Sequence, residues 1–328
     1  MNRLRARPTA NLFAIAFGVA GLAGALDALP AANPIAEAVW VIALLVWAGL
    51  VAAYALHTRR GPSVMEDLRH PVLGPFAALV PLVALMLVTH FSRHTGSTVA
   101  VGLAALALTV SIAFAGWFTA RWMLGGGELK QVHPGHLLPT VAASLVSAVC
   151  FSNLGLPGVA YALVGIGVMF WIVVTALFIA RGLSGHADLG ALTPTLAIHA
   201  APAPVIGILW LSLGSPGGAA IGEVLLGLTV FGVATQLFLI PRYVRLAFAP
   251  TFWSFTFSSA AVASFLARWV THEGLPAVLA VVPVVAVAVL IGSIGVRHLI
   301  DPLVRRRGAA PTSTARPRSA PAASRVPQ

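Results

Sequence analysis

The sequence has few residues that can be cross-linked or ionised. Its 328 residues include a single cysteine, Cys150, which lies in an apolar stretch. One thiol cannot form a disulfide within the chain, and it cannot supply a thiolate cluster for a metal ion. Charged residues make up 9% of the sequence, against about 25% in a typical soluble domain. These shortages exclude a disulfide-stapled fold and an ordinary soluble domain.

Acidic residues are scarcer than basic ones, with nine Asp and Glu against 20 Lys and Arg. Almost all of the acidic residues fall at the ends of expected helices or in loops, and only Glu223 falls inside an expected membrane span. Transporters coupled to protons or sodium usually carry ionisable groups at mid-membrane, because coupling needs a site that changes charge. The shortage therefore favours a passive conduit over a driven pump.

Glu223 and His199 are the candidate titratable groups for coupled transport. His199 lies between Pro194 and Pro204, where it could line a pore or hydrogen-bond a carbonyl that a nearby proline leaves free. We favour the second interpretation. The sequence contains neither HExxH nor GxSxG and no cluster of intramembrane Asp or His. We therefore expect no enzyme activity, no catalytic residues, no cofactor and no metal site.

The apolar content predicts a polytopic membrane protein. Hydrophobic residues make up 59% of the chain, and the mean hydropathy is +0.93. A helix needs about 20 apolar residues to cross the hydrocarbon layer, and an open strand would leave backbone groups unpaired there. We therefore predict an all-α protein. The expected spans are Asn11–Leu29, Ala36–Leu56, Gly74–Phe91, Thr98–Ala120, Leu138–Leu156, Gly158–Ala180, Leu192–Gly214, Ala219–Ile240, Thr251–Trp269 and Leu275–Leu299.

The basic residues predict the orientation of these ten spans. With the N-terminus in the cytoplasm, 18 of the 20 Lys and Arg residues fall on the cytoplasmic side, and only Arg93 and Arg268 fall outside. We expect a cytoplasmic N-terminus (1–10), a ten-helix membrane domain (11–300) and a disordered basic cytoplasmic tail (301–328). The net charge of +11 indicates contact with anionic lipid rather than with nucleic acid.

The spans form a weak internal repeat of five helical hairpins. Short outside loops join each odd-numbered span to the next even one, and prolines such as Pro81, Pro139 and Pro202 fall mainly in the odd spans. A proline inside a helix frees a carbonyl, which protein or water must then satisfy. The odd spans are therefore candidates for an inner ring around a central pore. The alternative is that the prolines only shape packing.

The ninth span is unusual because two phenylalanines, Phe255 and Phe257, alternate with small polar residues, Ser254, Thr256 and Ser258. A hydrophobic ring can gate a narrow wet path that hydroxyl groups line. The alternative is a tightly packed helix with Ser and Thr at helix contacts. Near the outer end of the third span, His90, Arg93 and His94 could draw anions toward a mouth or form a solvated loop.

Five patches resemble the tellurite-resistance/dicarboxylate transporter family, which includes the bacterial TehA proteins, the malic-acid transport proteins and the plant guard-cell slow anion channels. The patches lie in order along the odd spans, and the likeness covers residues 11 to about 300. They are Phe13-Ala-Ile-Ala-Phe-Gly18-Val-Ala-Gly21, Arg69-His-Pro71 with Phe76, His136-Leu-Leu-Pro139-Thr-Val-Ala, Ala200-Ala-Pro202-Ala-Pro-Val and Trp253-Ser-Phe-Thr-Phe257.

The resemblance implies ten helices in five hairpins around a pore, usually in a homotrimer with one pore per subunit. It also implies an occluding phenylalanine on the ninth helix, which maps to Phe257, with Phe255 as the second candidate. Gly18, Pro81, Pro139, Pro202, Ser254, Thr256 and Ser258 are candidate pore-lining or kink residues. The chain departs from the family pattern at Ala14, Ala16 and Ser258, which affects pore width and ion preference.

We therefore predict an anion channel or permease of the plasma (cell inner) membrane. It would pass chloride, nitrate, malate or other organic acids down their gradients, gated by Phe257. The first alternative is a proton-coupled exporter of C4-dicarboxylate, tellurite or sulfite. A membrane enzyme and a non-transporting scaffold are weaker alternatives.

Overall fold

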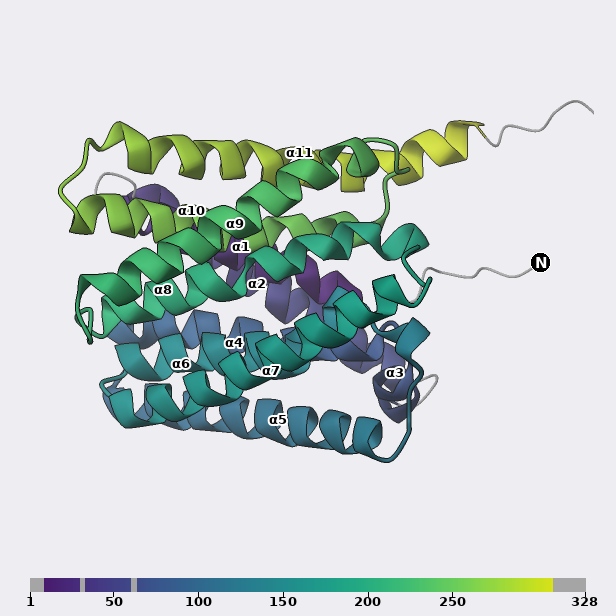
Figure 1. The fold of residues 1–328 in the computed structure, drawn as a ribbon, viewed down its shortest axis with the longest axis horizontal. Helices are drawn as coiled ribbons and strands as arrows, with labels where there is room; N and C mark the ends of the chain where they lie inside the picture. The colour runs from purple at the N-terminus through teal and green to yellow at the C-terminus, as the bar shows by residue number, and fades with distance from the viewer. Residues whose placement is uncertain (1–8, 30–32, 60–63, 309–328) are drawn as a thin grey trace, which may run out of the picture.

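A computed structural model describes residues 9–29, 33–59 and 64–308, and the regular structure in these ranges is helical throughout. Figure 1 shows long helices lying side by side along one axis. The expected N-terminal segment before residue 9 and the expected tail from residue 309 lie outside the described residues. The last helix, α11 (Val278–Gly308), continues past residue 300, where we expected the membrane domain to end.

Eight helical stretches are long and apolar enough to cross a membrane within the part of the chain that the structure describes. A shorter apolar helix, Ala10–Leu26, adds to them, and Ser254–His272 is less apolar because of its Ser and Thr residues. The chain is thus an all-helical polytopic membrane protein with eight to ten apolar helices, as the composition predicts. The eight are Pro34–Thr58, Gly74–His94, Ser97–Met123, Pro134–Asn153, Pro157–Leu183, Gly190–Ser212, Ala219–Tyr243 and Val278–Asp301.

Burial divides the helices into two groups that alternate along the chain. The apolar windows of Gly74–His94, Pro134–Asn153 and Gly190–Ser212 are 61%, 83% and 67% buried, whereas the windows of the other five candidate spans are 11–28% buried. The buried group is α1 (Phe13–Leu26), α4 (Leu79–Phe91), α6 (Ala143–Asn153), α8 (Pro202–Ser212) and α10 (Ser254–His272). The exposed group is α2 (Asn33–Thr58), α5 (Ser97–Met123), α7 (Pro157–Leu183), α9 (Ala219–Tyr243) and α11.

The five buried helices contact one another in a closed ring. Around this ring α1 packs on α4, α4 on α6, α6 on α8, α8 on α10, and α10 on α1. Each of them also packs against the exposed helix that follows it in the sequence. Because a short loop joins the two helices of each pair, the chain returns to the same end before the next buried helix begins (Figure 1). The five buried helices therefore run in the same direction.

Each buried helix begins with an irregular turn. The turns before α1, α4, α8 and α10 are 3₁₀ helices, and the turn before α6 is a π-helix. Proline lacks the amide hydrogen that a regular helix needs, and it occurs in all of these turns except the first. The turns are Ala10–Leu12, Gly74–Ala78, Leu138–Ala142, Gly190–Ala200 and Pro250–Trp253; the remaining short elements are α3 (Val64–Arg69), Ser92–His94, Leu129–Gln131 and Pro134–His136.

Candidate functional site

A cavity of about 710 Å³ opens among the five buried helices and extends to their C-terminal ends. We call this cavity the vestibule. All five buried helices contribute to its wall, so it lies on the axis of their ring. The lining residues used below are Gly21, Gly24 and Asp27 of α1, Trp40 of α2, Met86, Thr89 and His90 of α4, Arg93 in the following turn, Val146, Val149 and Asn153 of α6, Val205, Ile208 and Ser212 of α8, and Phe257, Ser264, Arg268 and Thr271 of α10.

The vestibule ends partway along the helices. On α10 the lining residues extend from Phe257 to His272, and on each of the other four buried helices they also begin partway along. The segment from Phe257 to Arg268 rises about 16 Å at 1.5 Å per residue, which is roughly half of a hydrocarbon layer about 30 Å thick. The vestibule lining on α10 therefore begins at Phe257, about half of a hydrocarbon layer from Arg268.

The Phe257 ring is held against α1. It stacks on the ring of Phe17 with the centroids 3.7 Å apart and the ring planes 17° apart. A Cβ atom placed on Gly21 would lie 3.2 Å from Phe257 Cδ2, and one placed on Gly18 would lie 2.0 Å from Thr256 Oγ1. Small residues allow helices to approach closely in a membrane. Gly18 and Gly21 thus bring α1 near enough to α10 for the two rings to stack.

Phe255, the second gate candidate, lies on a different side of α10. Its ring meets Tyr243 of α9 edge-to-face at 4.7 Å, and it is not among the residues that line the vestibule. Successive helical residues are about 100° apart, so residues 255 and 257 project in very different directions. Only Phe257 of the two therefore faces the cavity.

The three hydroxyl residues around Phe257 are buried, and the hydroxyls of Thr256 and Ser258 donate to backbone carbonyls one turn earlier. Thr256 Oγ1 donates to the Trp253 carbonyl at 2.7 Å, and Ser258 Oγ donates to the Ser254 carbonyl at 3.3 Å. None of the three lines the vestibule. Ser254 lies seven residues before the lining residue Ala261, and two helical turns place residues on one face. Ser254 therefore lies on the same face of α10 as the lining residue Ala261, beyond Phe257 toward the N-terminus of the helix.

The predicted kink prolines lie in different surroundings. Pro139 falls in the π-helical turn and Pro202 is the first residue of α8, and both are buried. Pro81 lines a separate apolar groove between α2, α4 and α5. None of the three prolines lines the vestibule, so their contribution is to the shape of the ring helices.

The two candidate coupling residues lie away from the vestibule lining. The His199 ring packs 4.9 Å from the Phe178 ring of α7, between an inner and an outer helix. Glu223 lies on an exposed face in the second turn of α9. Neither residue is part of the cavity wall.

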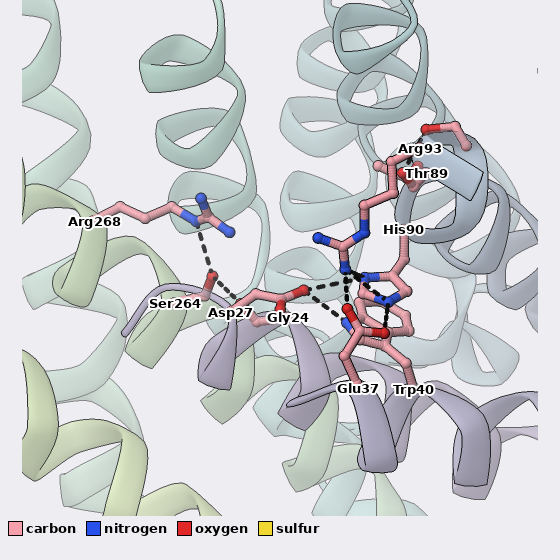
Figure 2. A network of polar contacts seen from close by, with 10 residues as sticks. Gly24, Asp27, Glu37, Trp40, Thr89, His90, Arg93, Ser264 and Arg268 are labelled. Atoms are coloured by element: carbon pink, nitrogen blue, oxygen red, sulfur yellow. Dashed lines mark hydrogen bonds and ion pairs between the residues drawn. The ribbon is translucent and has the colours of Figure 1, made fainter. Parts of the chain in front are cut away.

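A polar network occupies one side of the vestibule (Figure 2). His90 contacts two carboxylates, with Nδ1 3.3 Å from Asp27 Oδ2 and Nε2 3.0 Å from Glu37 Oε2. Trp40 donates from Nε1 to Asp27 Oδ2 at 2.7 Å, and Arg93 pairs with Glu37 at 2.5 Å. Opposite charges that are close together neutralise one another. His94, which we grouped with these residues, is exposed and is not among the lining residues.

Arg268 stands on the other side of the vestibule. Its Nε lies 3.4 Å from Ser264 Oγ, which in turn donates to the Gly24 carbonyl at 3.3 Å. Among the residues that the structure describes, its terminal nitrogens form no hydrogen bond and no ion pair. Figure 2 shows its guanidinium group directed toward the space that Arg93 faces from the opposite side. The vestibule thus contains a guanidinium whose terminal N–H donors have no partner among the described residues.

Sequence reasoning treated Arg268 only as one of two basic residues on the outside. A spacing signal was nevertheless present, because Arg268 follows Phe257 by eleven residues. Eleven residues make almost three full turns of helix, so the two side chains fall on one face. Asp27, Glu37 and Trp40 carried no such signal, because they come together only through tertiary contacts.

Comparison with known proteins gives one match. The family model described as voltage-dependent anion channel (SLAC1) matches residues 7–299. No curated protein matches the chain.

Proposed function

Because the chain belongs to the voltage-dependent anion channel (SLAC1) family, we propose that it is a channel through which small anions flow down their gradient between α1, α4, α6, α8 and α10. As a member of this family it is a membrane anion channel or transporter and not an enzyme. The observation that carries the proposal is the vestibule on the axis of the helix ring, with the stacked rings of Phe257 and Phe17 where its lining begins on α10.

The proposed architecture has ten membrane spans in five hairpins. The ring of buried helices and the exposed partner behind each of them support this arrangement. We propose that both termini are cytoplasmic, which the distribution of basic residues supports. The vestibule then faces outward. We also propose a homotrimer in the plasma membrane, with the basic tail against anionic lipid.

In the proposed mechanism, Phe257 forms a hydrophobic constriction. The ring excludes water and hydrated ions while it is stacked on Phe17. Rotation of the Phe257 side chain, or a small separation of α1 from α10, would join the vestibule to the inner half of the pathway. Ser254 and the partly positive N-termini of five parallel helices would then meet the anion on the inner side.

A gradient assay tests this proposal against the coupled exporter of dicarboxylate, tellurite or sulfite. The purified protein is reconstituted into liposomes, and a potassium diffusion potential drives chloride, nitrate or malate across the bilayer. A channel gives flux that follows the electrochemical gradient and stops at equilibrium. Accumulation of an anion beyond its equilibrium distribution, driven by a pH gradient, would instead establish the coupled carrier.

Substitution of the two candidate coupling residues is expected to have little effect on flux. Glu223→Gln and His199→Ala should each leave the anion flux within about twofold of wild type, because neither side chain lines the vestibule. Glu223 is also exposed, and surface substitutions away from a site have small effects. Liposome flux at pH 6 and pH 8 checks this expectation. A variant that folds normally and loses pH-driven uptake would overturn it.

Removal of a negative charge from the vestibule is expected to increase anion flux. Asp27→Asn keeps an acceptor for the Trp40 indole and removes a carboxylate from the cavity wall. A charge several ångströms from a permeating ion contributes on the order of 1 kcal/mol in a wet site, so we expect a two- to tenfold rise, roughly, at low salt. The effect should shrink in 1 M salt, where screening is strong. Unchanged flux at low salt would contradict the expectation.

A further inference from the structure

Among the residues that the structure describes, Arg268 is a cation of the vestibule wall whose terminal nitrogens the protein does not satisfy. Arg93 pairs with Glu37, and His90 lies between Asp27 and Glu37. Arg268, by contrast, contacts a serine hydroxyl through Nε, and its two terminal nitrogens have no hydrogen-bond or ion-pair partner among the described residues. Asp27 is the carboxylate that acts on Arg268 through the electrostatic field, but the two do not form an ion pair.

The position of Arg268 near the end of α10 does not by itself explain this arrangement. A cation in the last turns of a helix is favoured by the helix dipole. That effect would be satisfied equally well by a side chain directed into the surrounding water. Here Arg268 lines the cavity and is only partly exposed, and its fork of terminal nitrogens is directed into the cavity space (Figure 2).

A guanidinium with both terminal nitrogens available matches a carboxylate. The two parallel N–H donors of arginine pair with the two oxygens of one carboxylate group, which a spherical halide cannot reproduce. On this ground the Arg268 site discriminates by shape as well as by charge.

Another part of the vestibule wall, formed by α6 and α8, indicates what the rest of the ligand is. Val149 of α6 and Val205 and Ile208 of α8 present aliphatic side chains to the same cavity. A fully hydrated inorganic ion gains nothing from such a wall, whereas a short aliphatic chain is stabilised by burial against it. The cavity volume of about 710 Å³ is large enough for a ligand of several carbons.

The charge balance favours a ligand with one negative charge. Two arginines and two carboxylates surround the vestibule: Arg93, Arg268, Asp27 and Glu37. All of them except Arg268 belong to the network of ion pairs around His90. A second carboxylate on the ligand would find Arg93 already neutralised by Glu37, and it would be repelled by Asp27. The available positive charge is therefore that of Arg268 alone.

We propose that Arg268 forms a binding site for short aliphatic monocarboxylates in the vestibule, with the carboxylate on its terminal nitrogens and the aliphatic chain against Val149, Val205 and Ile208. The site lies before the closed end at Phe257 and selects organic monoanions over halides. Its use in transport rests on the proposed function, whereas binding to the vestibule does not.

Calorimetric titration of the full-length protein in nanodiscs tests the site with sodium butyrate, sodium succinate and sodium chloride as probes. We expect butyrate to bind more tightly than chloride and succinate. Arg268→Gln should weaken butyrate binding at least about tenfold, as expected for the loss of a charge-assisted, bidentate contact. Arg268→Lys keeps the charge and loses the fork, so it should weaken butyrate binding less than Gln does and leave chloride binding near wild type.

Arg242→Gln is the matched control, because it removes the same charge from an exposed position at the other end of the molecule. It should bind butyrate as wild type does. Butyrate affinity that is unchanged in Arg268→Gln would overturn the site, and stronger binding of succinate than of butyrate would overturn the preference for a single charge. If Arg268→Gln fails to fold, the affinities of Arg268→Lys for butyrate and chloride still test the site. Equal losses of affinity for both anions would contradict the bidentate contact.

Flux through a Phe257→Ala background separates this proposal from the proposed function. With the gate ring removed, Arg268→Gln should lower the permeability ratio of butyrate to chloride. One outcome is that butyrate binding depends on Arg268 while no variant gives a current. That outcome would support the binding site and reject the channel. The opposite outcome is a current through Phe257→Ala while neither butyrate binding nor the permeability ratio changes in Arg268→Gln. That outcome would support the channel and reject the binding site.

Discussion

Phe257→Ala is expected to raise the anion current through single reconstituted molecules by at least about tenfold. In the proposed mechanism, the ring closes the vestibule while it is stacked on Phe17. An aromatic pair contributes about 0.5–1.5 kcal/mol beyond the burial of its surface, and the burial of a phenylalanine contributes about 1.5–3 kcal/mol. Because Phe257 is only partly buried, the lower ends of both ranges apply. Their sum, about 2 kcal/mol, corresponds to a factor of roughly 30 in the population of the open state.

Phe255→Ala is the matched control for this experiment. It removes the same atoms from the same helix, but its ring packs against Tyr243 and lines no part of the vestibule. We expect its current to equal that of wild type. Phe17→Ala should also raise the current, because Phe257 then loses its stacking partner, though by less than Phe257→Ala does. Planar-bilayer recordings in chloride and nitrate measure all three variants. Equal currents for wild type and Phe257→Ala in well-folded samples would reject Phe257 as the gate.

Gly18→Ala is expected to destabilise the protein and loosen its gate. A Cβ atom on Gly18 would lie 2.0 Å from Thr256 Oγ1 and 2.6 Å from Thr256 Cβ, so α1 and α10 must move apart. Overpacking of this kind costs about 1–3 kcal/mol. The same separation would pull Phe17 from Phe257, so the basal anion current should rise while the thermal midpoint falls. A larger side chain, as in Gly18→Leu, should prevent α1 from packing on α10.

Gly24→Ala is the matched control on the same helix, two turns nearer the vestibule mouth. The nearest atom to a Cβ at this position is 3.9 Å away on Trp40, which is ordinary van der Waals contact. We expect no loss of thermal stability in this variant. Thermal unfolding in detergent, followed by size-exclusion chromatography, ranks the two variants. A Gly18→Ala protein as stable as Gly24→Ala would mean that the α1–α10 seam is less tight than the structure indicates.

The sequence predicted the positions of the helices well, because a membrane helix is specified by the local run of apolar residues. A stretch of about 20 apolar residues must form a helix in lipid, whatever the rest of the chain does. For this reason each expected span overlaps a helical stretch in the described residues, and eight of these stretches are long and apolar enough to cross a membrane. The same local patterns, in the motifs around Gly18 and Phe257, carried the resemblance to the anion-channel family, which the family match confirms.

The sequence predicted only in part which helices are buried and which are exposed. Prolines marked the third, fifth and seventh spans, but the first has none within α1 and the ninth none within α10. Both are among the buried helices. In these two helices the relevant signal is the run of small residues, which allows close packing on all sides.

The sequence by itself determined that this chain is a helical membrane protein, which of its faces is expected to meet the cytoplasm, and the family to which it belongs. These properties follow from composition, charge and short motifs, all of which act locally. Only the tertiary structure decided that Phe257 rather than Phe255 faces the cavity and that Glu223 and His199 lie outside its wall. It also decided that the terminal nitrogens of Arg268 face the cavity with no partner among the described residues. Those outcomes depend on how five helices far apart in the sequence rotate and pack around one axis, and no local pattern encodes such contacts.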